Sequence, residues 1–120
     1  MRYVKQEGIR DCGITCLYNI IRYYNGSVSL EKLRDLTHTD ENGTSIYNLM
    51  EASKKVGLTA RAYRCSLNDL ANLDFPMIAY IKLNNYYHFV IIKDIDFDSI
   101  SIFDPIRGDI SYTIEEFISI

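Results

Sequence analysis

The sequence contains no run of basic residues and no long apolar segment, and these two absences exclude several classes of protein. Its 13 Lys and Arg residues are scattered among 16 Asp and Glu residues, and the formal net charge is -3. Such a distribution cannot neutralise a row of phosphates, so we expect no nucleic-acid partner. No apolar stretch approaches the ~20 residues of a membrane-spanning helix, and residues 1–6 lack the apolar segment of a secretory signal. We therefore expect a soluble, cytoplasmic chain.

Cysteine is scarce and occurs an odd number of times. Two of the three cysteines, Cys12 and Cys16, are four residues apart, which suits one helix face but not the narrow geometry of a disulfide. A reducing compartment is consistent with this usage. The 120 residues, 48% of them hydrophobic, are enough for one core, so we expect a single domain over residues 1–120.

Hydrophobic periodicity predicts three helices in the first half of the chain. The first covers about residues 12 to 24, with Asp11 as a candidate N-cap. A second begins after Ser29, and a third begins after Thr44 or Ser45. The residues expected to face inward from the third helix are Ile46, Leu49, Met50 and Val56.

From Leu58 onward the apolar period changes to two, which predicts a sheet. The expected strands cover residues 59–64, 77–83, 86–92, 100–103 and 110–112. Asn84-Asn85 is suited to a tight hairpin turn, Ser66 and Asp69 form one capping box, and Thr113 and Glu116 form another at a last short helix. Helices followed by an antiparallel sheet indicate the α+β class.

Cys12 lies in the first turn of the first predicted helix. Unpaired backbone N–H groups and the helix dipole there favour an anion, so the thiol pKa should be lowered from about 8.5. A thiolate is the reactive form of cysteine, and Cys12 is therefore a candidate nucleophile. Its position alone does not separate this interpretation from that of a small buried cysteine.

The chain offers two histidines as a base for this nucleophile. His38 lies between two threonines in a polar loop and is most simply a surface residue. His88 lies in the strongest strand pattern of the chain, where a rigid element can hold an imidazole in place. The alternative for His88 is a half-buried strand histidine that is hydrogen-bonded to a backbone carbonyl.

An acid that orients His88 follows from the expected hairpin. If the turn is centred near Phe97, residue 106 lies opposite residue 88, and Asp104 is a diagonal neighbour of His88 at roughly 7 to 8 Å between Cα atoms. Asp104 followed by Pro105 is also consistent with a simple strand-ending turn.

Gln6 and the cysteines leave two further possibilities. The side-chain amide of Gln6, on the loop that leads into the first helix, is a candidate donor to an oxyanion beside the N–H of Cys12, although a surface role is the alternative. Cys12, Cys16 and His88 supply three possible zinc ligands, but a fourth is missing and Cys65 is isolated, so we expect no metal and no cofactor.

Taken together, these motifs resemble the C39 peptidase family, the N-terminal peptidase domains of bacteriocin-processing ABC transporters. The resemblance spans nearly the whole chain in the right order. The blocks that carry it are Val4-Lys5-Gln6, Asp11-Cys12-Gly13 with Cys16-Leu17, Gly43-Thr44-Ser45, Leu49, Ala52, Gly57-Leu58, His88-Phe89-Val90-Ile91 and Asp104-Pro105.

The resemblance implies a papain-like fold and a cysteine endopeptidase that removes a leader peptide after a Gly-Gly pair. By position, Cys12 is then the nucleophile, His88 the base, Asp104 the orienting acid and Gln6 the oxyanion donor. The implied substrate is a precursor with an amphipathic leader helix, for which exposed tyrosines and Met50 are candidate contacts.

The resemblance also leaves alternatives. The membrane and ATP-binding parts of a transporter are absent, so the chain is either an excised domain at the cytoplasmic face of the membrane or a free-standing relative. Some family-like domains have lost the cysteine and only bind leaders, and a catalytically silent leader-binding module is the alternative function. A small metal-binding domain is the third class.

Overall fold

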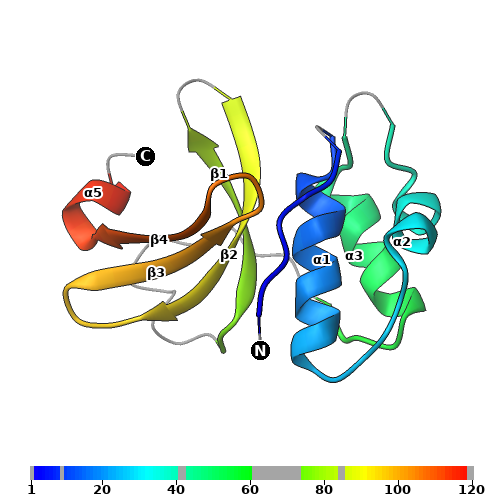
Figure 1. The fold of residues 1–120 in the computed structure, drawn as a ribbon, viewed down its shortest axis with the longest axis horizontal. Helices are drawn as coiled ribbons and strands as arrows, with labels where there is room; N and C mark the ends of the chain where they lie inside the picture. Colours follow the sequence, from blue (N-terminus) through cyan, green and yellow to red (C-terminus); the bar gives the residue numbers. More distant parts are fainter. Residues whose placement is uncertain (1, 9, 41–42, 61–73, 84–85, 119–120) are drawn as a thin grey trace.

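Three helices precede an antiparallel sheet in the computed structural model, which describes residues 2–8, 10–40, 43–60, 74–83 and 86–118 (Figure 1). The helices are α1 (Cys12–Tyr23), α2 (Leu30–Thr37) and α3 (Ile46–Lys55). The strands are β1 (Met77–Leu83), β2 (Tyr86–Ile95), β3 (Ser99–Asp104) and β4 (Gly108–Thr113), and α5 (Ile114–Ile118) follows the last of them. The helical layer and the sheet lie side by side, with the α1 face of the helical layer against the sheet (Figure 1).

Side-chain caps fix the starts of three helices as the sequence predicts. Ser29 accepts a hydrogen bond from the backbone N–H of Lys32 at 3.1 Å, and Ser45 accepts one from Asn48 at 3.0 Å. Thr113 and Glu116 exchange two such bonds, of 2.8 and 3.1 Å, at the start of α5. Each cap satisfies an N–H group that has no partner within its helix.

Two apolar clusters cover the two faces of the sheet. The first joins the helices to the sheet through residues such as Ile14, Leu17 and Leu33, with Phe89 and Ile91 from β2. Successive side chains of a strand point to opposite faces. The second cluster accordingly contains the alternate residues Val90, Ile92, Ile100 and Ile102, and Ile114 and Phe117 of the α5 region pack against it.

The β2–β3 hairpin has the register that the sequence predicts. Ile91 pairs with Phe103, a pair centred on residue 97, and the register shifts by a bulge between Ile92 and Asp94. The strands pair in the order β1-β2-β3-β4, each antiparallel to the next.

The predicted α+β arrangement, with N-terminal helices packed on a C-terminal antiparallel sheet, is confirmed. The expectation for Ile46 was wrong, because its side chain is 44% exposed at the first position of α3, whereas Leu49 one turn later is buried. Thr59 and Ala60 lie in no strand, and the rest of the predicted strand at 59–64, the capping box at Ser66 and Asp69 and the Asn84-Asn85 turn lie outside the described residues.

Candidate active site

Cys12 is the first residue of α1, and it contacts the imidazole of His88. Burial by itself would raise the pKa of the Cys12 thiol. A side-chain hydrogen bond with His88, backbone hydrogen bonds with Phe89 and Gly13, and the charge of His88 outweigh this effect and lower the pKa. The pKa of the thiol is therefore lowered, as the sequence predicts, but mainly by His88, and the Gly13 N–H at the helix start is the smallest of these contributions.

His88 lies in β2 opposite Ile81 of β1 and is 3% exposed. Its Nε2 atom is 3.0 Å from Oδ1 of Asp104. Burial would lower the pKa of the imidazole, but the hydrogen bonds and charges of Asp104 and Cys12 raise it to about 9. The imidazolium form is therefore favoured at neutral pH.

Asp104, the last residue of β3, is 2% exposed. Its carboxylate accepts hydrogen bonds from the backbone N–H groups of Ile106 and Arg107 at 2.8 and 3.3 Å. Burial would raise the pKa of Asp104, whereas the hydrogen bond with His88 and these backbone donors hold it far below its usual range. Asp104 is thus a fixed negative charge beside the imidazole.

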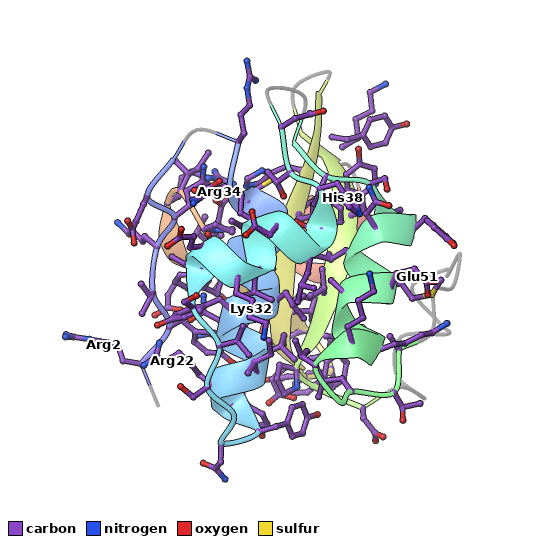
Figure 2. The ribbon with its side chains drawn as sticks, turned by 90° about the vertical axis from the view of Figure 1, so that its right-hand side faces the viewer. Arg2, Arg22, Lys32, Arg34, His38 and Glu51 are labelled. Carbon is purple, nitrogen blue, oxygen red and sulfur yellow. The ribbon has the colours of Figure 1, made fainter. Side chains whose placement is uncertain are left out.

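The hairpin explains why His88 and Asp104 meet. The pairing of Ile91 with Phe103 puts residue 106 opposite residue 88, so Asp104 is offset by two positions on the same face, as predicted. His38, the other candidate base, caps the end of α2 and is exposed (Figure 2). The structure therefore brings together the predicted Cys12, His88 and Asp104.

Gln6 lies beside this cluster, on the segment that leads to α1. Its backbone N–H donates to the carbonyl of Pro105 at 2.8 Å, which ties the segment to the residue after Asp104. The side-chain Nε2 donates to the Gly8 carbonyl at 2.7 Å, and the buried Oε1 has no partner among the described residues. Because an amide nitrogen carries two hydrogens, Nε2 retains one for a second acceptor.

The sequence prediction missed the role of Asp11 and its partner Arg34. Asp11 occupies the N-cap position of α1, but its side chain makes no capping bond. Its carboxylate instead accepts from the Gly8 N–H at 3.1 Å and from Nη2 of Arg34 at 2.6 Å. Arg34 comes from α2 (Figure 2), so a helix distant in sequence fixes the loop before Cys12. No local sequence signal reveals a pair 23 residues apart.

A model of the peptidase C39 family matches residues 1–120 of this chain. The chain belongs to this family. The match agrees with the resemblance inferred from the motifs, and it makes the site at the start of α1 the candidate active site of a peptidase.

Several relatives are transporters of much greater length. The lactococcin-G-processing and transport ATP-binding protein LagD of Lactococcus lactis is 32% identical over 119 residues, which are 97% of this chain and 17% of that relative. An uncharacterized protein of Methanothermobacter thermautotrophicus is 31% identical over 114 residues, which are 95% of this chain and 78% of that protein. This chain therefore spans a small part of the transporter relative and most of the archaeal one.

Two solved structures share the fold. The peptidase domain of Streptococcus ComA, described as a bi-functional ABC transporter, superposes with a TM-score of 0.88 at 28% identity, covering 98% of this chain and 90% of that chain. A double glycine motif protease from an AMS/PCAT transporter, in complex with the leader peptide, has a TM-score of 0.87 at 30% identity, covering 97% and 84%. The fold is that of C39 peptidase domains.

Cys16 differs from Cys12 in burial and in the acidity of its thiol. Cys16 is fully buried, and burial raises the pKa of its thiol well above the ordinary value, which makes it unreactive. Cys65 lies outside the described residues. Within the described residues, no three His, Cys, Asp or Glu side chains gather as metal ligands, and no helix has the length and apolarity for crossing a bilayer.

Proposed function

We propose that this chain is a cysteine endopeptidase that removes the leader from a secreted peptide precursor by cleaving after a Gly-Gly pair. The observation that carries the proposal is the contact between Cys12, at the start of α1, and the buried pair of His88 and Asp104. The similarity of this chain to a double glycine motif protease in complex with the leader peptide supports this substrate class.

Cys12 acts as the nucleophile in this proposal, and His88 as its base and acid. The raised pKa of His88, about 9, and the lowered pKa of Cys12 support a resting thiolate–imidazolium pair. Asp104 keeps the imidazole oriented and stabilises its positive charge. The preformed thiolate is ready to attack without a separate deprotonation step.

Attack of the Cys12 thiolate on the carbonyl carbon of the second glycine forms a C–S bond and a tetrahedral oxyanion. The backbone N–H of Cys12 and the side-chain amide of Gln6 stabilise this oxyanion. The oxyanion collapses as the C–N bond breaks, and His88 transfers its proton to the leaving amine. His88 then deprotonates a water molecule that hydrolyses the thioester, which regenerates the thiolate and releases the leader with a carboxyl terminus.

The leader helix is expected to dock away from the scissile bond, because two glycines offer no side chain for recognition. Tyr80 of β1 packs 4.5 Å from Phe89 and 5.1 Å from Tyr87, measured between ring centroids, and both tyrosines are exposed. This aromatic ladder begins at the residue after His88. Together with Met50 and the exposed Tyr47 of α3, it is the proposed contact surface for an amphipathic helix.

The residues 1–120 form one peptidase domain in this proposal. Its expected partners are the precursor peptide and, if the chain is part of a transporter, the membrane and nucleotide-binding parts of that transporter. The transporter relatives support this assignment, and they support a location at the cytoplasmic side of the membrane.

A synthetic precursor with an amphipathic helix and a Gly-Gly junction tests the proposal. Mass spectrometry should detect one cut after the second glycine. Cys12→Ala should lower turnover by about a thousandfold or more, because the thiol supplies the chemistry, and should leave leader affinity nearly unchanged.

Two controls make this result decisive. A precursor with the second glycine replaced by leucine should resist cleavage by the unchanged enzyme. A chain that binds the leader tightly but never cleaves it would instead be a silent leader-binding module, and turnover that survives Cys12→Ala would assign the cleavage to another residue.

A further inference from the structure

The hydrogen bonds to Asp104 are distributed unevenly between its two carboxylate oxygens. Oδ1 accepts from Nε2 of His88 at 3.0 Å and from the backbone N–H groups of Ile106 and Arg107 at 2.8 and 3.3 Å. Oδ2 accepts from Nε of Arg107 at 3.1 Å, the one donor that the structure gives it among the described residues. The rotation of the carboxylate therefore depends on the Arg107 side chain.

Arg107 is held at its other end as well. Its Nη2 atom donates to the hydroxyl of Tyr112 in β4 at 3.0 Å. The guanidinium is planar and rigid, so contacts at Nε and Nη2 together fix its plane. The Arg107 side chain is 50% exposed whereas that of Asp104 is 3% exposed, so a surface residue controls a buried carboxylate.

We propose that Arg107 is a positioning residue, which fixes the rotation of the Asp104 carboxylate and thereby the direction in which His88 is held. The inference rests on the proposed peptidase function. Arg107 touches neither the thiol nor the imidazole in the described contacts, and it acts through Asp104. Tyr112 supports it from the neighbouring strand.

Loss of the Arg107 side chain has two opposing effects on His88. Removal of a cation would raise the pKa of the imidazole, but this charge is half exposed and screened by solvent, so the effect is small. Removal of the Arg107 donor leaves Oδ2, a buried oxygen, without a partner among the described residues, so the carboxylate rotates to share the two backbone donors between its oxygens. The hydrogen bond between Asp104 and His88 then weakens. Because this bond contacts the imidazole directly, its weakening lowers the pKa of His88 by more than the loss of the cation raises it.

Arg107→Met, which keeps an unbranched side chain but has no hydrogen-bond donor for Oδ2 of Asp104, tests the inference with two measurements. In peptide cleavage, kcat should fall by about tenfold while KM changes by less than about twofold, because the substrate contacts are untouched. In an NMR titration of the substrate-free protein, the pKa of His88 should fall below its value of about 9. Lys93→Met is the matched control, because it removes the cation of an ion pair with Asp109, at 2.8 Å, that does not involve Asp104.

Two further variants separate geometry from charge and from folding. Arg107→Lys keeps the charge but lacks the fork that reaches both partners, so it should restore little activity. Tyr112→Phe should have a weaker effect than Arg107→Met and should add nothing in the Arg107→Met background. Full activity of Arg107→Lys, additive effects of Tyr112→Phe and Arg107→Met, or an unchanged His88 titration in Arg107→Met would overturn the inference. The titration needs no substrate, so it remains decisive even if the unchanged chain cleaves no Gly-Gly peptide.

Discussion

Folding changes the pKa values of the Cys12 thiol and the His88 imidazole in opposite directions. In an unfolded chain the imidazole loses its proton first, near pH 6.5, and the thiol follows near 8.5. In the fold the pKa of His88 is raised to about 9 and that of Cys12 is lowered, despite burial that opposes both changes. Asp104 is the main reason for the raised value, because its hydrogen bond to His88 is the strongest of the effects that favour the imidazolium.

Asp104→Asn should therefore lower kcat by an order of magnitude or more, because an amide provides no charge for the imidazolium and favours the wrong tautomer of His88. The fold should persist, since the amide is nearly isosteric and can still accept from the Ile106 N–H at 2.8 Å. The loss should be smaller than for Cys12→Ala. Steady-state kinetics on a Gly-Gly precursor measures the kcat of both variants, and circular dichroism checks the fold.

Asp94→Asn is the internal control for this prediction. Asp94 is exposed near the turn end of β2, and its carboxylate accepts from the N–H of Ile95 at 2.9 Å. An unchanged kcat for Asp104→Asn beside a lowered kcat for Asp94→Asn would show that another acid serves His88.

Cys12 and His88 could be predicted because cysteine and histidine are rare in the chain and their local patterns are strong. Asp104 could be predicted because the hairpin register separates it from the other aspartates. Arg107 and Arg34 could not. Arginine is common in exposed loops and helices, and both of these side chains are in fact partly exposed, at 50% and 41%. Their importance comes from the buried carboxylates that they reach, and burial of those carboxylates depends on tertiary contacts.

At the level of elements, the approach of α1 to the sheet decides whether the thiol meets the imidazole. Gly13, the residue after Cys12, is buried, and a Cβ atom there would lie 2.6 Å from Cγ2 of Thr44 and 3.3 Å from Cδ2 of Phe89. A side chain at position 13 would thus push the start of the helix away from β2. Glycine is required there for close packing, not for a special backbone angle.

Gly13→Ala should lower kcat by about tenfold or more, because a displacement of about 1 Å at a reacting group is enough for such a loss. It should also lower the melting temperature by a few degrees. Activity assays and thermal unfolding of the same preparation measure both.

A compensating change provides the control for Gly13→Ala. Thr44→Ser removes the methyl group in the way and keeps the hydroxyl that donates to the Thr37 carbonyl at 3.1 Å. The double variant should recover part of the lost activity. Full activity of Gly13→Ala alone, or no recovery in the double variant, would mean that close packing here does not position Cys12.

The elements themselves were readily predicted from local sequence, whereas some of their details were not. Capping residues and apolar periods gave the helix starts, and a turn centred on Phe97 gave the β2–β3 register. The bulge between Ile92 and Asp94 has no counterpart in the apolar pattern, because a bulge adds a residue without changing which residues are apolar. Ile46 was wrongly expected to face inward. Hydrophobic periodicity shows which face of a helix is apolar, but it does not show at which turn that face becomes exposed.

On the scale of the whole molecule, the candidate site joins the two layers of the fold. Cys12 belongs to the helical layer, and His88 and Asp104 belong to the sheet (Figure 1). A resting ion pair between the layers should therefore link the protonation of the site to the free energy of unfolding. His88 and Cys12 change the pH dependence of this free energy in opposite directions.

The free energy of unfolding should depend on pH differently in the unchanged chain and in Cys12→Ala. His88, whose pKa rises from 6.5 to about 9 on folding, stabilises the fold fully below pH 6.5 and loses this contribution as the pH rises through about 9. Cys12, whose pKa is lowered on folding, gains a contribution over the upper part of that range, because the folded thiol ionises before the unfolded one. The two trends offset each other in the unchanged chain.

Cys12→Ala removes the offset, while Asp104 continues to raise the pKa of His88. Urea unfolding from pH 6 to 9 should therefore show a loss on the order of 1 to 3 kcal/mol in Cys12→Ala, and a clearly smaller loss in the unchanged chain. Asp104→Asn should weaken the loss that comes from His88, because it removes the main cause of the raised pKa of His88, so the opposite contribution of Cys12 should become more visible at high pH. Other titrating groups are common to all three proteins and cancel in the comparison. Equal slopes for the unchanged chain and Cys12→Ala would mean that no thiolate–imidazolium pair joins the two layers.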